Sequence, residues 1–188
     1  GTLLSETSAT LSSDDTAYGL AIVCSVTPSD DEESGTTVDS DAVTITNSAP
    51  SIDTASISPD PAYTGDTLTC SWTSYSDDDE HTDQSTVVWK INGSLAGSGT
   101  TLSSGFVYGD IVKCIVTPSD GIDSGDTVST DISISNTGPV LDSVSLAPTT
   151  AYEGDTLVCT PGTISDADGN TNFTKSYAWS VDGSDPGV

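Results

Sequence analysis

The chain has 188 residues, and 29 acidic against 3 basic residues give it a formal net charge of −26. Phosphate binding needs clustered Lys or Arg, so this composition excludes nucleic acid as a default partner. Anionic membrane surfaces are disfavoured for the same reason. The longest apolar runs, such as residues 20–23, are too short to span a bilayer, so we expect no membrane insertion.

A repeat with an offset of 89 or 90 residues runs through the chain. Three motifs recur at this spacing, namely Thr-Pro-Ser-Asp at 27–30 and 117–120, Asn-x-x-Pro at 47–50 and 136–139, and Ala-Tyr-x-Gly-Asp-Thr-Leu-x-Cys at 62–70 and 151–159. Self-similarity at a fixed period is typical of repeat proteins, in which each unit contacts mainly its neighbours.

The repeat predicts one complete unit and two partial ones. Residues 1–49 carry the C-terminal half of a unit, residues 50–138 form a complete unit, and residues 139–188 carry the N-terminal half of the next. We therefore expect the chain to be a window from a longer tandem array.

Within the complete unit, apolar and polar residues alternate with a period of two, as in half-buried strands. The first predicted strand, residues 52–57, shifts phase, which indicates a bulge or a sheet switch. The later strands each place three residues on one face, namely Leu68, Cys70 and Trp72; Val87, Trp89 and Ile91; Val112, Cys114 and Val116; and Val128, Ile132 and Ile134. Turn-forming clusters separate the strands and no helical apolar stripe occurs, so we predict an all-β antiparallel sandwich.

Acidic residues gather in the predicted loops. Residues 77–83 fill the connection between the first cysteine strand and the Trp89 strand, and residues 166–170 are their equivalent in the next unit. Further clusters follow the second cysteine position at 30–33 and 120–126. Closely spaced carboxylates offer the hard oxygens of which calcium takes 6–8, although the EF-hand pattern is absent.

The order Cys70, Trp89, Cys114 matches the immunoglobulin-domain signature. Together with the Asn-x-x-Pro, Tyr-x-Gly-Asp-Thr-Leu-x-Cys, Ser-Asp-Ala-Asp-Gly and Cys-x-Val-Thr-Pro-Ser-Asp motifs, it makes the unit resemble the Ig-like or cadherin-like repeats of large bacterial surface and extracellular proteins. The chain departs from the Ig pattern at Val112, where a tyrosine corner has Tyr, and in the acidic insertion between Cys70 and Trp89.

The resemblance implies tandem immunoglobulin-like β-sandwiches and a disulfide between Cys70 and Cys114. Cys24 holds the second cysteine position of one partial unit, and Cys159 holds the first cysteine position of the other. Their partners would therefore lie outside this window or in another copy of the chain. Disulfides imply an oxidising, extracellular or cell-surface location. Thiolate metal binding is the rival interpretation, but the chain has no Cys-x-x-Cys spacing.

In such sandwiches, loops from two successive units meet at their junction. At the junction after the complete unit, we expect ligands from the end of that unit where the chain leaves it and from the acidic loop of the next unit. At the junction before the complete unit, we expect ligands from the complete unit's own acidic loop. The predicted Ca²⁺ ligands are Asp66, Asp110 and Asn136; Asp166, Asp168 and Asn170; and Asp77 and Asp79. The alternative is that these acids are simply solvated surface.

The predicted function is architectural. The chain would be a segment of a stalk, fibre or filament whose partners are neighbouring copies of the same repeat, in the same chain or end to end. The alternative is an adhesin segment that binds surface glycans or a partner cell. We expect no enzyme, because adjacent loop acids lack the apolar pocket of a catalytic acid, and because His81 is the single histidine and Gly-x-Ser-x-Gly is absent.

Overall fold

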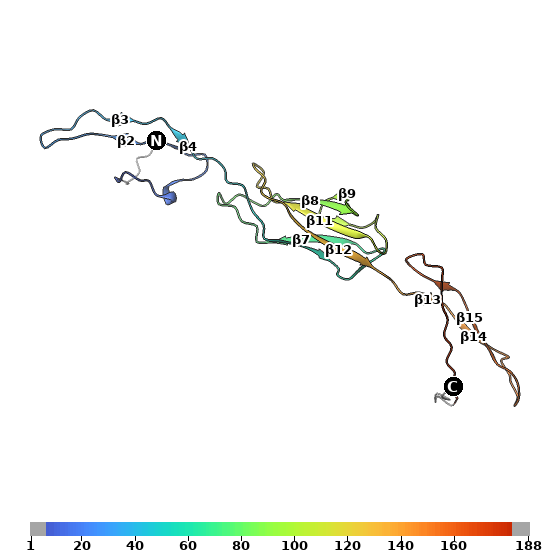
Figure 1. Cartoon of the computed structure of the whole chain (residues 1–188). Coiled ribbons are helices and arrows are strands. Elements are labelled where there is room, and N and C mark those ends of the chain that lie inside the picture. The colour runs from blue at the N-terminus through green and yellow to red at the C-terminus, as the bar shows by residue number, and fades with distance from the viewer. Residues whose placement is uncertain (1–6, 182–188) are drawn as a thin grey trace.

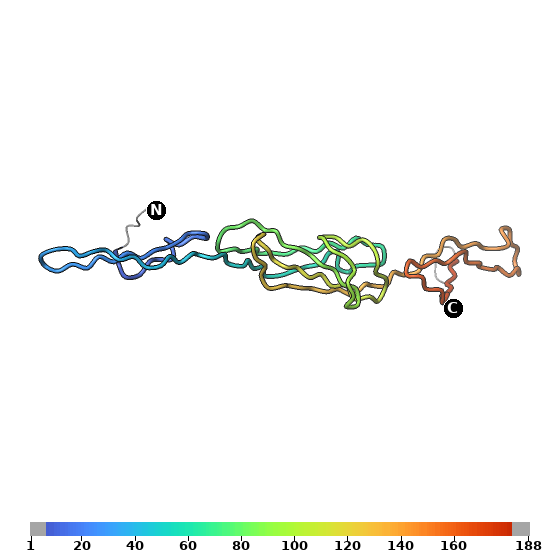
Figure 2. Tube along the Cα trace, turned by 90° about the horizontal axis from the view of Figure 1, so that it is seen from above, coloured from blue at the N-terminus to red at the C-terminus, as the bar shows by residue number. Residues whose placement is uncertain are grey.

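The computed structural model describes residues 7–181, which form an elongated β-structure in three successive parts (Figure 1). A narrow N-terminal part, a thicker central part and a narrow C-terminal part follow one another along one line (Figure 2). The helical content of the described residues is a single 3-10 turn, η1 (Ser13–Asp15). No helix in this described part is long and apolar enough to cross a membrane.

The central part contains two sheets that face each other. The first has three antiparallel strands in the order β10 (Thr101–Leu102), β7 (Leu68–Thr73) and β5 (Thr54–Ser58). The second has five, in the order β6 (Ala62–Tyr63), β12 (Val128–Ser135), β11 (Ile111–Thr117), β8 (Thr86–Ile91) and β9 (Ser94–Ser98). Only the β6–β12 pair among them is parallel.

Strand alternation places one face of each sheet inside. Along β11, Val112, Cys114 and Val116 are buried while the residues between them are more exposed, as the period-two pattern predicts. The full set of buried apolar residues is Ile52, Ile57, Ala62, Leu68, Cys70, Val87, Trp89, Leu102, Phe106, Val112, Cys114, Val116 and Ile134. The all-β prediction is therefore confirmed, with one contiguous core between the two sheets.

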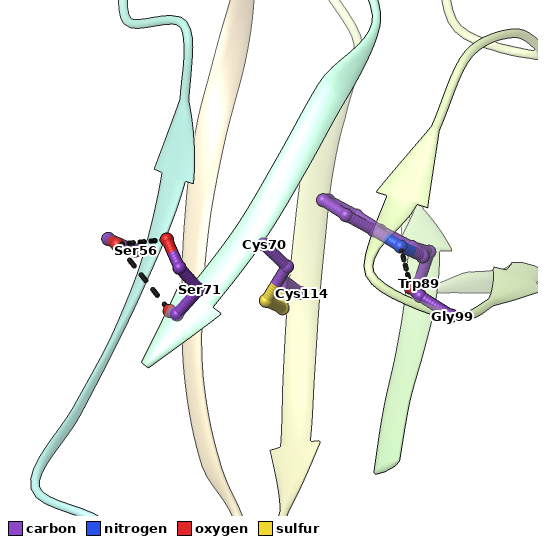
Figure 3. Close-up of a disulfide and its surroundings, with 6 residues drawn as sticks. All are labelled: Ser56, Cys70, Ser71, Trp89, Gly99 and Cys114. Carbon is purple, nitrogen blue, oxygen red and sulfur yellow. Dashed lines mark hydrogen bonds between the residues drawn. A yellow bond between two sulfur atoms is a disulfide. The ribbon is translucent and has the colours of Figure 1, made fainter. Parts of the chain in front are cut away.

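A disulfide links the two sheets at the centre of this core. Cys70 on β7 is bonded to Cys114 on β11, as predicted, and Trp89 stands opposite Cys114 in the β8–β11 register (Figure 3). Trp89 is fully buried, and its indole N–H donates a 2.8 Å hydrogen bond to the carbonyl of Gly99. The largest core side chain thus has its polar atom satisfied.

The terminal parts consist of two-stranded ribbons. In the N-terminal part β1 (Ala21–Ile22) pairs with β4 (Val43–Thr44), and β2 (Ser25–Val26) with β3 (Val38–Asp39). In the C-terminal part β13 (Val140–Leu141) pairs with β16 (Ile164–Ser165), and β14 (Val144–Ala147) with β15 (Val158–Pro161). Their apolar side chains are largely exposed, because a two-stranded ribbon has no second sheet to cover its face. Cys24 and Cys159 are free thiols here.

The sequence repeat recurs as a repeat of hydrogen bonds. The backbone N–H of Gly125 donates to Pro118 at 3.0 Å, and the N–H of Gly35, 90 residues earlier, donates to Pro28 at 2.8 Å. Corresponding β-bridges join Ser119 to Ser124 and Ser29 to Ser34. Local geometry is thus shared between the central part and a ribbon that lacks a core.

Candidate metal centres at the two junctions

The first junction joins the N-terminal part to the central part. We define it as residues 47–50 together with the loop between β7 and β8 and the loop between β11 and β12. The backbone N–H of Ser48 donates a 2.6 Å hydrogen bond to Oδ2 of Asp79. Asp79 in turn donates its own N–H to Oδ1 of Asp77 at 3.0 Å. Short Asp side chains that accept backbone N–H groups fix this loop in a tight conformation.

Asn47 connects the linker to the other loop of this junction. Its Nδ2 donates to Oδ2 of Asp120 at 2.7 Å and to Oδ2 of Asp123 at 2.9 Å. The remaining oxygen of Asp120, Oδ1, accepts the backbone N–H groups of Ile122 and Asp123, both at 2.7 Å. Asp120 is only 3 % exposed and is the buried charged residue of the described chain.

Asp120 is ionised at neutral pH despite its burial. Desolvation opposes the charged form, but the hydrogen bonds from Asn47 and from the backbone of Asp123 and Ile122 outweigh it and lower the pKa of Asp120 to about 2. The first junction therefore holds a buried negative charge. No lysine of the described residues pairs with it, since the one Lys–carboxylate ion pair there joins Lys113 to Asp131.

Three side chains converge at the first junction. One ligand atom from each of Asp77, His81 and Asp120 lies within 4.8 Å of the other two. The Asp77 side chain is 1 % exposed, and its Oδ2 has no hydrogen-bond partner. The Nδ1 of His81 and the Oδ1 of Asn47 are likewise buried without a partner. Unpaired polar atoms in a buried anionic cluster are costly, and a bound cation would satisfy them.

The second junction joins the central part to the C-terminal part and repeats this loop geometry. The N–H of Thr137 donates a 2.5 Å hydrogen bond to Oδ2 of Asp168, and the N–H of Asp168 donates to Oδ1 of Asp166 at 2.8 Å. Asp166 and Asp168 stand 89 residues after Asp77 and Asp79. The Thr64 hydroxyl adds a 2.6 Å hydrogen bond to Oδ1 of Asp168.

These contacts keep Asp168 charged. The hydrogen bond from Thr64 is the largest cause and the N–H of Thr137 the next, and together they lower the pKa of Asp168 below its ordinary value. Asn170 lies beside them, with Nδ2 3.4 Å from Oδ1 of Asn136 and 3.5 Å from Oδ1 of Asp166. Asn136, Asp166 and Asn170 line one cavity with Pro139, Gly169, Thr171, Asn172 and Phe173.

Two of the predicted ligands accept hydrogen bonds from groups close to them in the central part. Asp66 accepts the N–H of Tyr63 at 2.8 Å within its own turn. Asp110 accepts the N–H of Val107 at 2.9 Å and the Nδ2 of Asn92 at 2.7 Å. The central part contacts Asp168 through the hydroxyl of Thr64.

Three residues of the first junction were not among the predicted ligands. Asn47 is the 89-residue equivalent of Asn136, so the repeat itself could have indicated it. Asp120 is the last residue of a Thr-Pro-Ser-Asp motif that also ends at Asp30. This repeat of the motif could have indicated that Asp120 has a role of its own. Nothing in the sequence pattern distinguishes His81 from an ordinary exposed loop histidine.

No family model matches the chain, and neither the curated proteins nor the solved structures provide a match. The donor atoms themselves define the chemistry available. At the second junction they are carboxylate and amide oxygens from residues 136–170. At the first junction an imidazole nitrogen joins the carboxylates of Asp77 and Asp120. Both sets suit a divalent cation.

Proposed function

We propose that the chain is a structural segment of an extracellular tandem array of Ig-like repeats, and that Ca²⁺ bound at the junctions stiffens the array. The proposal depends on a hydrogen bond between linker and acidic loop that occurs at both junctions. The linker N–H of Ser48 binds Asp79, and the linker N–H of Thr137 binds Asp168, in equivalent Asp-x-Asp loops. At each junction the carboxylate of the second Asp in the loop therefore holds the linker backbone, and the carboxylate of the first Asp holds the backbone of the second.

The central part supports the Ig-like interpretation. Two facing sheets, a Cys70–Cys114 disulfide between them and a buried Trp89 beside it are the features that define an Ig core. The disulfide also favours an extracellular or cell-surface location, because such bonds persist in oxidising compartments. Neighbouring copies of the repeat are the partners that this architecture requires.

Electrostatics explain why a cation would matter. With a net charge of −26, the loops that meet at a junction repel one another, which loosens the joint. Calcium takes 6–8 oxygen ligands at flexible geometry, and carboxylates, amide oxygens and water supply them here. At about 1 mM free calcium, a site with a Kd of about 10⁻⁴ M would stabilise its junction by about 1.4 kcal/mol.

A glycan-binding adhesin has less support. The exposed aromatic side chains of the C-terminal part include Trp179, at 45 % exposure. Trp179 is the repeat equivalent of Trp89, which is fully buried in the complete unit. Its exposure reflects a unit without its second sheet rather than a platform for sugar stacking.

Small-angle scattering and thermal unfolding, each with calcium and then with EGTA, test the proposal. Calcium should lengthen and stiffen the particle and raise the unfolding midpoint. Asp168→Asn should abolish the response at the second junction, whereas Asp131→Asn, the same charge change on β12, should retain it. Identical scattering curves with calcium and EGTA would contradict the calcium-stiffened array.

A further inference from the structure

The Asp-x-Asp loops of the two junctions differ at one position that can supply a ligand. His81 and Asn170 are repeat equivalents, 89 residues apart, in otherwise matching Asp-x-Asp loops. The first junction therefore has an imidazole nitrogen where the second has an amide. Calcium prefers oxygen, whereas imidazole is a preferred ligand of Zn²⁺ and other first-row transition metals. This difference points to different metal selectivity at the two junctions.

His81 stands close to two carboxylates without forming a hydrogen bond to either through its ring. Its Nδ1 lies 3.6 Å from Oδ1 of Asp77 and 3.8 Å from Oδ2 of Asp120, both too long for a hydrogen bond. Ligands of a tetrahedral ion with bonds of about 2.1 Å stand about 3.4 Å apart. The observed separations are close to that edge length, so an ion between these side chains would need little rearrangement.

Two further features orient the cluster. The His81 ring packs edge-on against Tyr18, with centroids 5.3 Å apart and an interplanar angle of 80°. The backbone N–H of His81 donates to Oδ1 of Asp77 at 3.0 Å, which leaves Oδ2 of that buried carboxylate free. Tyr18 belongs to the N-terminal part, so both sides of the junction hold the imidazole in place.

We propose that the first junction is a mixed nitrogen–oxygen site for a first-row transition-metal ion, with Zn²⁺ as its probe. Asp77, His81 and Asp120 supply three ligands, and the unpartnered Oδ1 of Asn47 or a water supplies the fourth. The second junction, with oxygen ligands, remains a calcium site. This inference rests on the proposed function in treating the junction clusters as cation sites, but it assigns a different metal to one of them.

Metal titration of the 188-residue chain tests the assignment. The chain should carry Cys24→Ser and Cys159→Ser, because these free thiols would bind zinc themselves, and it should lack a polyhistidine tag. After treatment with EDTA, calorimetry with Zn²⁺ in the presence of 1 mM Ca²⁺, about the extracellular level assumed above, should give one tight site. His81→Asn, which reproduces the ligand of the second junction, should weaken zinc binding at least tenfold.

Asp131→Asn, on β12, is the control and should leave the zinc affinity unchanged. His81 is the only histidine, so a shift of its imidazole NMR signals on adding Zn²⁺ reports ligation directly. Equal zinc affinity in the parent and the His81→Asn chain, with both folded by their unfolding midpoints, would overturn the inference. Zinc binding through His81 without any calcium effect on particle shape would support it while overturning the calcium-stiffened array.

Discussion

The Thr64 hydroxyl donates a 2.6 Å hydrogen bond to Oδ1 of Asp168, a residue 104 positions further along the chain. The same hydroxyl oxygen accepts the backbone N–H of Tyr108 at 3.0 Å. Thr64 and Tyr108 belong to the central part, whereas Asp168 belongs to the C-terminal ribbons. One hydroxyl group therefore joins two turns of one unit to the acidic loop of the next.

Replacing Thr64 with Val should loosen the second junction. The substitution keeps the side-chain shape but removes the donor that orients Asp168, and loss of such an outer partner lowers metal affinity about tenfold or more. We expect weaker calcium binding and a broader distribution of particle lengths in scattering, with only a small drop in the unfolding midpoint of the central part, which loses the hydrogen bond from Tyr108. Thr64→Ser restores the hydroxyl and should behave as the parent chain; a calcium affinity in Thr64→Val equal to that of the parent would contradict this role.

Gly125→Ala should strain the first junction. A Cβ on Gly125 would overlap the carbonyl oxygen of Pro50, a backbone atom of the linker, and would also crowd the ring of Pro118. We expect a loss of about 1–3 kcal/mol in unfolding free energy, typical of overpacking. Gly138 lies in the other linker with open space around it. Gly138→Ala should therefore change stability little, and equal effects of the two substitutions would contradict the close approach.

Removing the disulfide should destabilise the central part substantially. Cys70 and Cys114 close a loop of 44 residues, which the chain-entropy model values at about 4 kcal/mol. Denaturant unfolding of the Cys70→Ala, Cys114→Ala double variant should show most of that loss. Cys24→Ser removes an exposed thiol outside the core and should leave the same transition in place.

The strands could be predicted from the sequence because they depend on local periodicity, and the disulfide because the order Cys70, Trp89, Cys114 resembles an Ig-like core. Val112, Cys114 and Val116 alternate along one strand, so their shared burial follows from backbone geometry. The contacts that build the junctions are different in kind. Asn47 meets Asp120 across 73 residues, and no periodicity indicates which loop touches which linker.

Asp66 and Asp110 could be located in turns from the sequence, but the direction of their side chains could not. Both follow a glycine in a turn, and their side chains accept the N–H three residues earlier, from Tyr63 and Val107. A short Asp side chain satisfies the nearest backbone donor before a distant partner. Composition identified these turns as acidic, but the local hydrogen bond determines where each carboxylate points.

Trp89→Phe should weaken the core by about 2–3 kcal/mol. The substitution leaves a void where the indole was fully buried and deprives the Gly99 carbonyl of its donor. Trp72→Phe is the comparison, because Trp72 is partly exposed and its indole N–H binds the exposed loop residue Asp83. A similar loss of unfolding free energy in both variants would contradict the central position of Trp89.

Acid should destabilise the cation-free protein through Asp120. Its pKa is about 2 in the folded chain, against an ordinary value of 3.8, so the folded state favours the ionised form. The contribution of Asp120 to the free energy of unfolding is fully present above about pH 4 and is lost as the pH falls from about 4 to about 2. Asp120→Asn retains an acceptor for Asn47 but cannot ionise. In EDTA, its unfolding midpoint should start lower at pH 6 and fall less steeply below pH 4 than that of the parent. Parallel profiles for the two chains would show that the buried carboxylate of the first junction contributes no pH-dependent stability.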